Sequence, residues 1–177
     1  MLELSNTNRK GFKMGLDMYL NAKKYISKID WEATNKLEDL GDGYAVHEQF
    51  NDIIRTAEME DFPLTDIHGL SVEVGVAYWR KVNAVHAWFV QHVQDGEDNC
   101  GDYHVSKDKL KELLGLCQLV LGNRDPSLLP PSEGFFFGGT EIDEWYWEGV
   151  ESTIEQISAI LAMPDFENYS FSYQSSW

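Results

Sequence analysis

Two polar residues that could contact a ligand lie among apolar neighbours in the stretch YWRKVNAVHAWF, residues 78–89. Asn83 and His86 are three positions apart, so a helix would place both on the apolar face that carries Trp79. Polar side chains on a buried face need hydrogen-bond partners, because an unpaired buried polar group costs about 1–3 kcal/mol. The pair therefore either lines a cavity and binds a ligand, or ties the helix to a neighbouring loop. In the first case Arg80 is the natural partner for a phosphate.

A second stretch, HVQDGEDNCGDYH at residues 92–104, gathers acids, two histidines and a cysteine. An EF-hand loop counted from Asp95 would place Cys100 and Ser106 where a glycine and a bidentate acid are needed. The stretch also lacks paired zinc ligands of the CxxC or HxxxH kind. Weak calcium binding and a solvated acidic loop are the two interpretations that remain. The acids around Cys100 make it a poor nucleophile, so the sequence predicts neither a metal centre nor a catalytic residue.

The stretch GFFFGGTEIDEWYWEGV, residues 134–150, places aromatic residues beside acids. Amides at the start of the following helix could bind an anion, but acids crowd the same positive end and disfavour a bare phosphate there. A nucleotide fits better, with its base stacked on an aromatic ring and a carboxylate bonded to ribose hydroxyls or amino groups. In the alternative interpretation residues 135–137 form a buried strand, and Thr140 and Asp143 form a capping box for the helix.

Together these stretches predict one polar and aromatic binding site that needs no metal and no cofactor. The expected ligand contacts are Trp79, Arg80, Asn83, His86, Tyr103, Phe136, Phe137, Thr140, Asp143 and Tyr146. This site requires three stretches that are far apart in the sequence to meet in the fold.

Hydrophobic periodicity predicts the elements that must position these residues. Residues 14–20 alternate between apolar and other side chains and predict a half-buried strand, as does the tail around residues 169–173. Residues 72–93 have apolar positions at steps of three and four, which predicts one long helix. A second helix is expected after Ser106, its N-cap, and a third over residues 140–161.

This order of elements predicts a single α+β domain over residues 14–177, preceded by a flexible N-terminal lead of residues 1–13. About three main helices would pack on a small antiparallel sheet that includes the N- and C-terminal strands. Residues 22–60 do not decide between strand and helix.

The charge distribution limits the kinds of partner that we expect. The chain of 177 residues carries a net charge of −16, and residues 125–177 contain ten acids and no Lys or Arg. Such a surface repels DNA and RNA, so direct nucleic-acid binding is not expected, whereas a basic protein surface would be attracted. In the alternative interpretation the acidity only maintains solubility.

The sequence also predicts a location. No stretch is apolar enough to cross a membrane, and the N-terminal segment lacks the apolar core of a signal peptide. Cys100 and Cys117 are the only cysteines, and they fit two reduced thiols. A cytoplasmic location without membrane contact is therefore expected.

Several blocks resemble those of a widespread family of small, functionally uncharacterised proteins encoded by bacteriophages and prophages. The blocks are MGLDMYL, YWRKVNAVHAWF with QDGEDNCGDYHVS, and LLPPSEGFFFGGTEIDEWYWE. The resemblance covers residues 14 to about 153. It assigns no role to any residue, but it implies a setting in the cytoplasm of a host cell. Small acidic phage proteins without an enzyme motif often act against the host, including its defence systems.

Three functions follow as hypotheses. The leading one is a counter-defence protein that sequesters a small nucleotide-derived immune signal, a sponge, and forms a homo-oligomer. The first alternative is an acidic inhibitor that binds a host defence protein through the C-terminal third of the chain, as a nucleic-acid mimic. The second alternative is an enzyme that degrades a nucleotide signal, with His86 as general acid or base.

Overall fold

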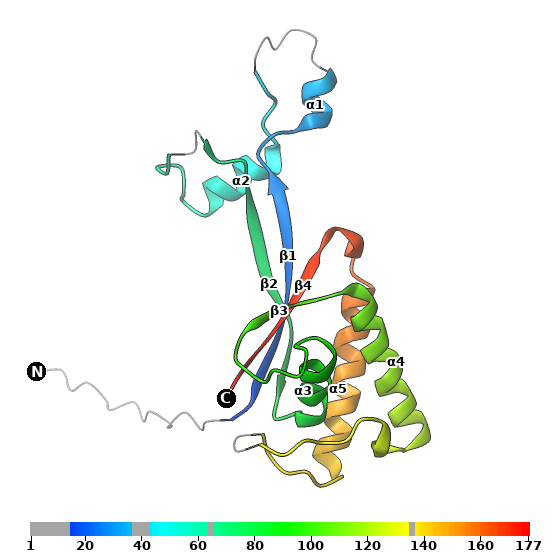
Figure 1. Ribbon diagram of the computed structural model, residues 1–177. Helices are drawn as coiled ribbons and strands as arrows, with labels where there is room; N and C mark the ends of the chain where they lie inside the picture. The colour runs from blue at the N-terminus through cyan, green and yellow to red at the C-terminus, as the bar shows by residue number, and fades with distance from the viewer. Residues whose placement is uncertain (1–14, 37–42, 64–65, 135–136) are drawn as a thin grey trace, which may run out of the picture.

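The fold is built on one antiparallel sheet. The computed structural model describes residues 15–36, 43–63, 66–134 and 137–177. In these residues four strands follow the order β2–β1–β4–β3, and neighbouring strands run antiparallel. They are β1 (Asp17–Ser27), β2 (Gly69–Arg80), β3 (Asp102–Val105) and β4 (Ser170–Ser176). The central pair, β1 and β4, comes from opposite ends of the chain, as the sequence predicted (Figure 1).

Alternating side chains explain how β1 joins the core. Leu16, Met18 and Leu20 are completely buried, whereas Tyr19 is 38% exposed. Successive side chains of a strand point to opposite faces, so one face of the sheet packs on the core and the other meets solvent. The predicted half-buried strand is confirmed, and it continues to Ser27.

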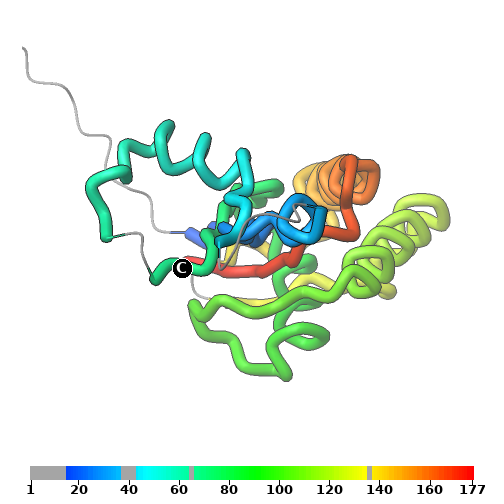
Figure 2. Tube along the Cα trace, turned by 90° about the horizontal axis from the view of Figure 1, so that it is seen from above, coloured from blue at the N-terminus to red at the C-terminus, as the bar shows by residue number. Residues whose placement is uncertain are grey.

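Three helices share one hydrophobic core with the sheet: α3 (Asn83–His92), α4 (Lys107–Asn123) and α5 (Glu144–Leu161). Helices α4 and α5 lie side by side, as both views show (Figures 1 and 2). The helix predicted after Ser106 is confirmed as α4, in which Leu113, Cys117 and Val120 are completely buried. The Ser106 hydroxyl caps α4 by accepting a hydrogen bond from the Lys109 amide, also as predicted. The α+β class is therefore confirmed.

Beyond the reach of β4, strands β1 and β2 continue as a two-stranded ribbon. Strand β4 pairs with β1 only from Asp17 to Lys23. The ribbon carries two short helices, α1 (Trp31–Lys36) and α2 (Glu48–Thr56), and projects past the rest of the molecule (Figure 1). We call the described residues between 24 and 72 the arm. Its own small core contains Ile26, Phe50 and Ile54.

The prediction of one helix over residues 72–93 is wrong. Residues 69–80 form β2, and α3 begins only at Asn83. In β2, Ala77 and Trp79 are buried while Tyr78 between them is exposed, which is the two-residue period of a strand. Valine and aromatic residues favour strands, and β2 pairs with the whole length of β1. Lys81, with a left-handed φ of 59°, turns the chain from strand to helix.

Predictions near the start of α5 also need correction. The capping box of Thr140 and Asp143 is wrong, because Asp143 itself is the N-cap: its carboxylate accepts from the Tyr146 amide at 3.2 Å, and α5 starts at Glu144. Phe137 is in no strand, while Phe135 and Phe136 lie outside the described residues. Strand β3 was missed, because glycines and acids around it predicted a loop.

The N-terminal lead of residues 1–13 also lies outside the described residues. None of the helices in the described parts of the chain is long and apolar enough to span a membrane.

Candidate functional site

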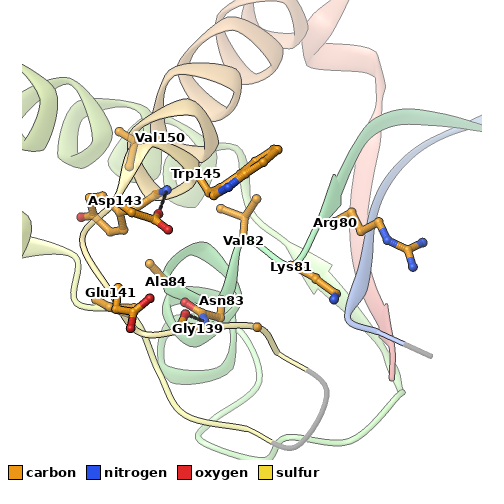
Figure 3. Close-up of a pocket in the computed structure, with 13 residues that line it drawn as sticks. Arg80, Lys81, Val82, Asn83, Ala84, Gly139, Glu141, Asp143, Trp145 and Val150 are labelled. Atoms are coloured by element: carbon orange, nitrogen blue, oxygen red, sulfur yellow. Dashed lines mark hydrogen bonds between the residues drawn. The ribbon is translucent and has the colours of Figure 1, made fainter. Parts of the chain in front are cut away.

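A cavity of about 540 Å³ lies where β2 ends and where α3 and α5 begin (Figure 3). Cavities of roughly 300–1,000 Å³ hold small molecules. We call it the α5 cavity. Its lining residues are Arg80, Lys81, Val82, Asn83, Ala84, Pro131, Gly138, Gly139, Glu141, Asp143, Trp145, Tyr146 and Val150.

Asn83 ties the segment after Phe137 to the start of α3. Its side-chain amide donates to the Gly139 carbonyl at 2.8 Å and to the Phe137 carbonyl at 3.4 Å. The Ser132 hydroxyl donates to the Asn83 carbonyl at 3.3 Å, which ties residue 132 to the same helix start. The sequence left two roles open for Asn83: contact with a ligand, or a tie between the helix and a neighbouring loop. The structure shows the tie, and Asn83 also lines the cavity.

Lys81 lies at the turn between β2 and α3 with an exposed side chain. Its amide donates to the Leu16 carbonyl at 2.8 Å, which fixes the turn to the end of the sheet. Gly138, with a φ of 94°, brings the opposite segment against Lys81, and a Cβ on this glycine would lie 3.6 Å from the Lys81 Cβ. The cavity wall at this turn is thus held by backbone contacts, and it carries an exposed ammonium group.

The start of α5 forms the facing wall. Tyr146 is buried there, and its hydroxyl donates to the Leu129 carbonyl at 2.9 Å. Burial raises the pKa of Tyr146 to about 12, so the hydroxyl keeps its proton and remains a donor at neutral pH. The adjacent Trp145 is 78% exposed, and Glu141 and Asp143 are exposed acids beside it. This wall offers an aromatic ring and two carboxylates to a bound molecule.

Arg80 lines the cavity but its guanidinium is directed elsewhere. Figure 3 shows the side chain pointing away from Glu141 and Asp143, toward β1. Its Nη1 lies 3.1 Å from Oδ1 of Asp17, and the Tyr78 hydroxyl donates to the same carboxylate oxygen. Lys81 is the other cation that lines the cavity, and its side chain also extends away from Glu141 and Asp143 in Figure 3.

His86 lies outside the cavity, in the core. It is completely buried, with Nε2 3.2 Å from Oδ1 of Asp98 and Nδ1 2.8 Å from the Tyr173 hydroxyl. Since a carboxylate only accepts, Nε2 donates to Asp98 and Nδ1 accepts from Tyr173. Burial lowers the pKa of His86, although the charge and hydrogen bond of Asp98 oppose this shift. The Phe137 ring packs edge-on at 4.8 Å between centroids.

The structure brings together only part of the predicted contact set. Arg80, Asn83, Asp143 and Tyr146 line the α5 cavity. Three others lie in different parts of the structure: Trp79 is buried against Phe89, Tyr103 of β3 bonds with Asn99, and Phe137 packs on His86. Thr140 is exposed beside the cavity but does not line it. Phe136 lies outside the described residues.

Among the lining residues that were not predicted from the sequence, three carry a charge or an exposed aromatic ring: Lys81, Glu141 and Trp145. Each had a signal, because Lys81 follows Arg80 directly and the other two flank the Asp143 cap. For Lys81 the signal was hidden by the long-helix prediction, which did not foresee the turn between β2 and α3.

The acidic stretch of residues 92–104 does not form a metal centre in the structure. Within the described ranges, no group of three or more His, Cys, Asp or Glu side chains could hold a metal ion. Asp98 instead bonds with His86 and accepts from the Trp177 indole at 3.2 Å.

Burial raises the pKa of Cys117 to about 12, which makes this thiol a poor nucleophile.

Comparison of the chain with protein-family models, with curated proteins and with solved structures finds no match. The α5 cavity therefore has to be interpreted from its own chemistry.

Proposed function

We propose that the protein binds a small nucleotide-derived signal in the α5 cavity and holds it without converting it. The observation that supports this proposal is the arrangement of the walls: an exposed lysine on one side, and an exposed tryptophan with two carboxylates on the other. A nucleotide presents the matching groups, namely a phosphate, a flat base and sugar hydroxyls. A volume of about 540 Å³ suits a ligand of this size.

Each part of the ligand has a partner in this arrangement. The Lys81 ammonium pairs with a phosphate oxygen through a charge-assisted hydrogen bond. The Trp145 ring stacks on the base, an interaction worth about 1–3 kcal/mol. Glu141 accepts from ribose hydroxyls or from an amino group of the base. Asp143 contributes less, because its Oδ1 already accepts from the Tyr146 amide.

Sequestration is favoured over catalysis by what lines the cavity. Its described wall contains no Ser, Thr, Cys or His. His86, the general acid or base of the enzyme hypothesis, is completely buried and bonds through both ring nitrogens to protein groups. An enzyme at this site would have to use Lys81, Glu141, Asp143 or Tyr146 instead.

The proposed setting is the cytoplasm of a phage-infected host, where the protein would act against a defence signal. This setting rests on the resemblance of the sequence blocks to those of phage proteins. A sponge acts by stoichiometry, so its activity requires a dissociation constant below the working concentration of the signal.

Calorimetric titration against cyclic dinucleotides, cyclic trinucleotides and ADP-ribose derivatives tests the proposal. Trp145→Ala should weaken the binding of a hit by roughly 5- to 100-fold, the equivalent of lost stacking. Trp31→Ala is the matched control, since Trp31 is 55% exposed on the arm, and it should bind like the wild type. If folded protein binds nothing in the panel, the proposal is wrong.

A second candidate function is supported by the surface of α5. Glu144, Glu148, Glu151 and Glu155 are all exposed, and their spacing of four, three and four residues places them on one face of the helix. At a rise of about 1.5 Å per residue they form a row about 16 Å long. An even row of negative charge resembles a nucleic-acid backbone, so this face could bind the basic groove of a host defence protein.

A salt-sensitive pull-down from host lysate tests this candidate. Replacing the four α5 acids by Gln should abolish capture of the partner, because the row supplies the attraction. The control variant neutralises four exposed acids of the arm: Glu32, Glu48, Glu58 and Glu60. Equal loss of capture in both variants would show that only net charge matters and would rule out a specific contact through α5.

A further inference from the structure

Strand β2 forms one edge of the four-stranded sheet. Its outer side has no neighbouring strand among the described residues (Figure 1). Near Arg80 the edge is covered, because the Tyr78 amide donates to the Gln156 side chain at 2.8 Å. Farther along, Ser71, Glu73, Val74 and Gly75 are exposed. An exposed edge presents unpaired amide and carbonyl groups that can pair with another strand.

Few of the features that usually protect a sheet edge from pairing with another strand occur here. The segment GLSVEVGV, residues 69–76, contains no proline and no lysine. Its one charge, on Glu73, is paired with Lys23 of the neighbouring strand at 3.1 Å. A bulge occurs only where Val76 is the extra residue opposite Leu20 and Asn21. The stretch before this bulge is regular, and Val74 on it is 55% exposed.

An apolar groove of about 300 Å³ adjoins this edge. Val72, Val74 and Val76 form part of its lining, together with Met163 and Tyr169 from the chain after α5. The free edge and the groove thus meet at the same valines. A molecule that pairs with the edge therefore also removes the apolar groove from water.

We propose that the occupant of this edge is a second copy of the chain, whose β2 pairs antiparallel with β2 of the first around a two-fold axis. Val74 lies in the regular stretch before the bulge. A two-fold axis there places Val74 opposite Val74, while Glu73 faces Gly75. Apolar side chains meet across the axis, and the two acids do not.

Charge does not oppose a second copy of the chain at this edge. A chain with a net charge of −16 can self-associate only where its acids are kept apart. The β2 edge meets that condition, because Glu73 is its one charge between residues 69 and 76 and is already paired with Lys23. The two four-stranded sheets would join into one continuous sheet. The interface lies away from the α5 cavity, so this inference does not rest on the proposed function.

Sedimentation equilibrium of the full chain tests the proposal. The wild type should have twice the 20.3 kDa mass of one chain. Val74→Lys should be monomeric, because it places two like charges opposite each other at the axis. Leu119→Lys is the matched control, since Leu119 is 57% exposed on α4, and it should remain a dimer. A monomeric wild type at every concentration would overturn the inference, as would a dimer that Val74→Lys leaves intact.

Hydrogen exchange of the wild type provides a test that needs no variant. Amides of residues 71–75 should exchange faster when dilution dissociates the dimer. Protection confined to another surface, such as the β3 edge or the exposed face of α5, would show that a different interface is used and would contradict the proposal.

Discussion

In the proposed function, three side chains determine which ligands the α5 cavity holds. Lys81 supplies a positive charge, Glu141 supplies an acceptor, and Trp145 supplies a flat ring that is 78% exposed. The buried residues beneath them have structural roles, as Asn83 ties the loop and Tyr146 donates to Leu129. Ligand variants should therefore target the exposed residues, because changes to the buried ones alter the cavity wall itself.

The charge on Lys81 can be tested without disturbing the turn that carries it. Its φ of 59° disfavours most residues, but asparagine tolerates this conformation. Lys81→Asn should keep the fold and weaken binding of a phosphate-bearing ligand by roughly 10- to 100-fold, because a charge-assisted hydrogen bond is lost. Titration at two salt concentrations checks this, since the wild type should lose affinity in high salt more steeply than the variant. Equal salt dependence in both proteins would exclude Lys81 as the phosphate partner.

His86 should make stability depend on pH. Burial lowers the pKa of its folded state below the ordinary value of 6.5, so the unfolded chain takes up a proton more readily than the folded chain. The contribution of His86 to stability is therefore complete above about pH 6.5 and is lost as the pH falls toward the lower folded pKa. Urea unfolding between about pH 7 and about pH 5 should show a smaller decrease in unfolding free energy for His86→Gln than for wild type.

The exposed histidine of β3 provides the control for this measurement. His104→Gln should retain the decrease of the wild type, because His104 is an exposed residue and the buried His86 is left in place. If His86→Gln and wild type lose the same free energy over this pH range, the buried histidine is not the source of the pH dependence.

The position of the α5 cap gives another test at the level of single residues. Asp143→Ala should lower the free energy of unfolding by about 0.5–2 kcal/mol, because its carboxylate caps the Tyr146 amide. Thr140→Ala should change it little, since Thr140 is exposed and precedes the cap. Denaturant unfolding compares the two variants. A larger decrease in unfolding free energy for Thr140→Ala than for Asp143→Ala would support the capping box instead.

At the level of elements, the cavity exists because β2 changes into α3 at Lys81 directly opposite the start of α5. Close packing holds these elements together. A Cβ on Gly149 of α5 would lie only 2.8 Å from Cγ1 of Val82, so the helix approaches the turn as closely as a glycine permits. The distance between α5 and the turn sets the width of the cavity.

Two glycine substitutions test this packing. A Cβ added at Gly115 in α4 would meet no atom within 4 Å, so Gly115→Ala should stabilise the protein by about 0.5–1 kcal/mol through helix propensity. Gly149→Ala should instead destabilise it, because the methyl group must displace Val82, and overpacking costs about 1–3 kcal/mol. Urea unfolding of both variants distinguishes the cases, and equal stabilisation would contradict close packing of α5 on the turn.

Elements with a regular period could be predicted from the sequence, and the transition between two elements could not. The strand through Met18 and the helix through Leu113 show one uninterrupted period each, and both are confirmed. Residues 69–92 contain a two-residue period followed by a helical one, and their apolar positions also fit steps of three and four. Pairing of β2 with β1, a contact distant in sequence, decides the outcome. That error hid Lys81, so the sequence predicted only part of the α5 cavity.

At the scale of the whole molecule, we assign three different regions to a small ligand, to a protein partner and to a second copy of the chain. These regions differ in their charge and in their position in the fold. The α5 cavity is lined by residues at the end of β2 and at the start of α5. The arm projects at the opposite end of β1 and β2 (Figure 1). Four exposed acids lie along α5, whereas the β2 edge between residues 69 and 76 carries one acid, which is paired with Lys23. A dimer through β2 would therefore leave both copies of the α5 cavity open to a ligand.

The most direct test of the proposed function asks whether a bound signal returns unchanged. The protein is incubated with the signal that gives the strongest titration, free signal is measured, and the mixture is then heated to unfold the protein. We expect depletion of the free signal, followed by full recovery of the intact molecule. Because Trp145→Ala lacks the stacking ring, wild type should deplete more signal than this control variant does. Recovery of an altered product would make the protein an enzyme, and depletion by neither protein would contradict binding in the α5 cavity.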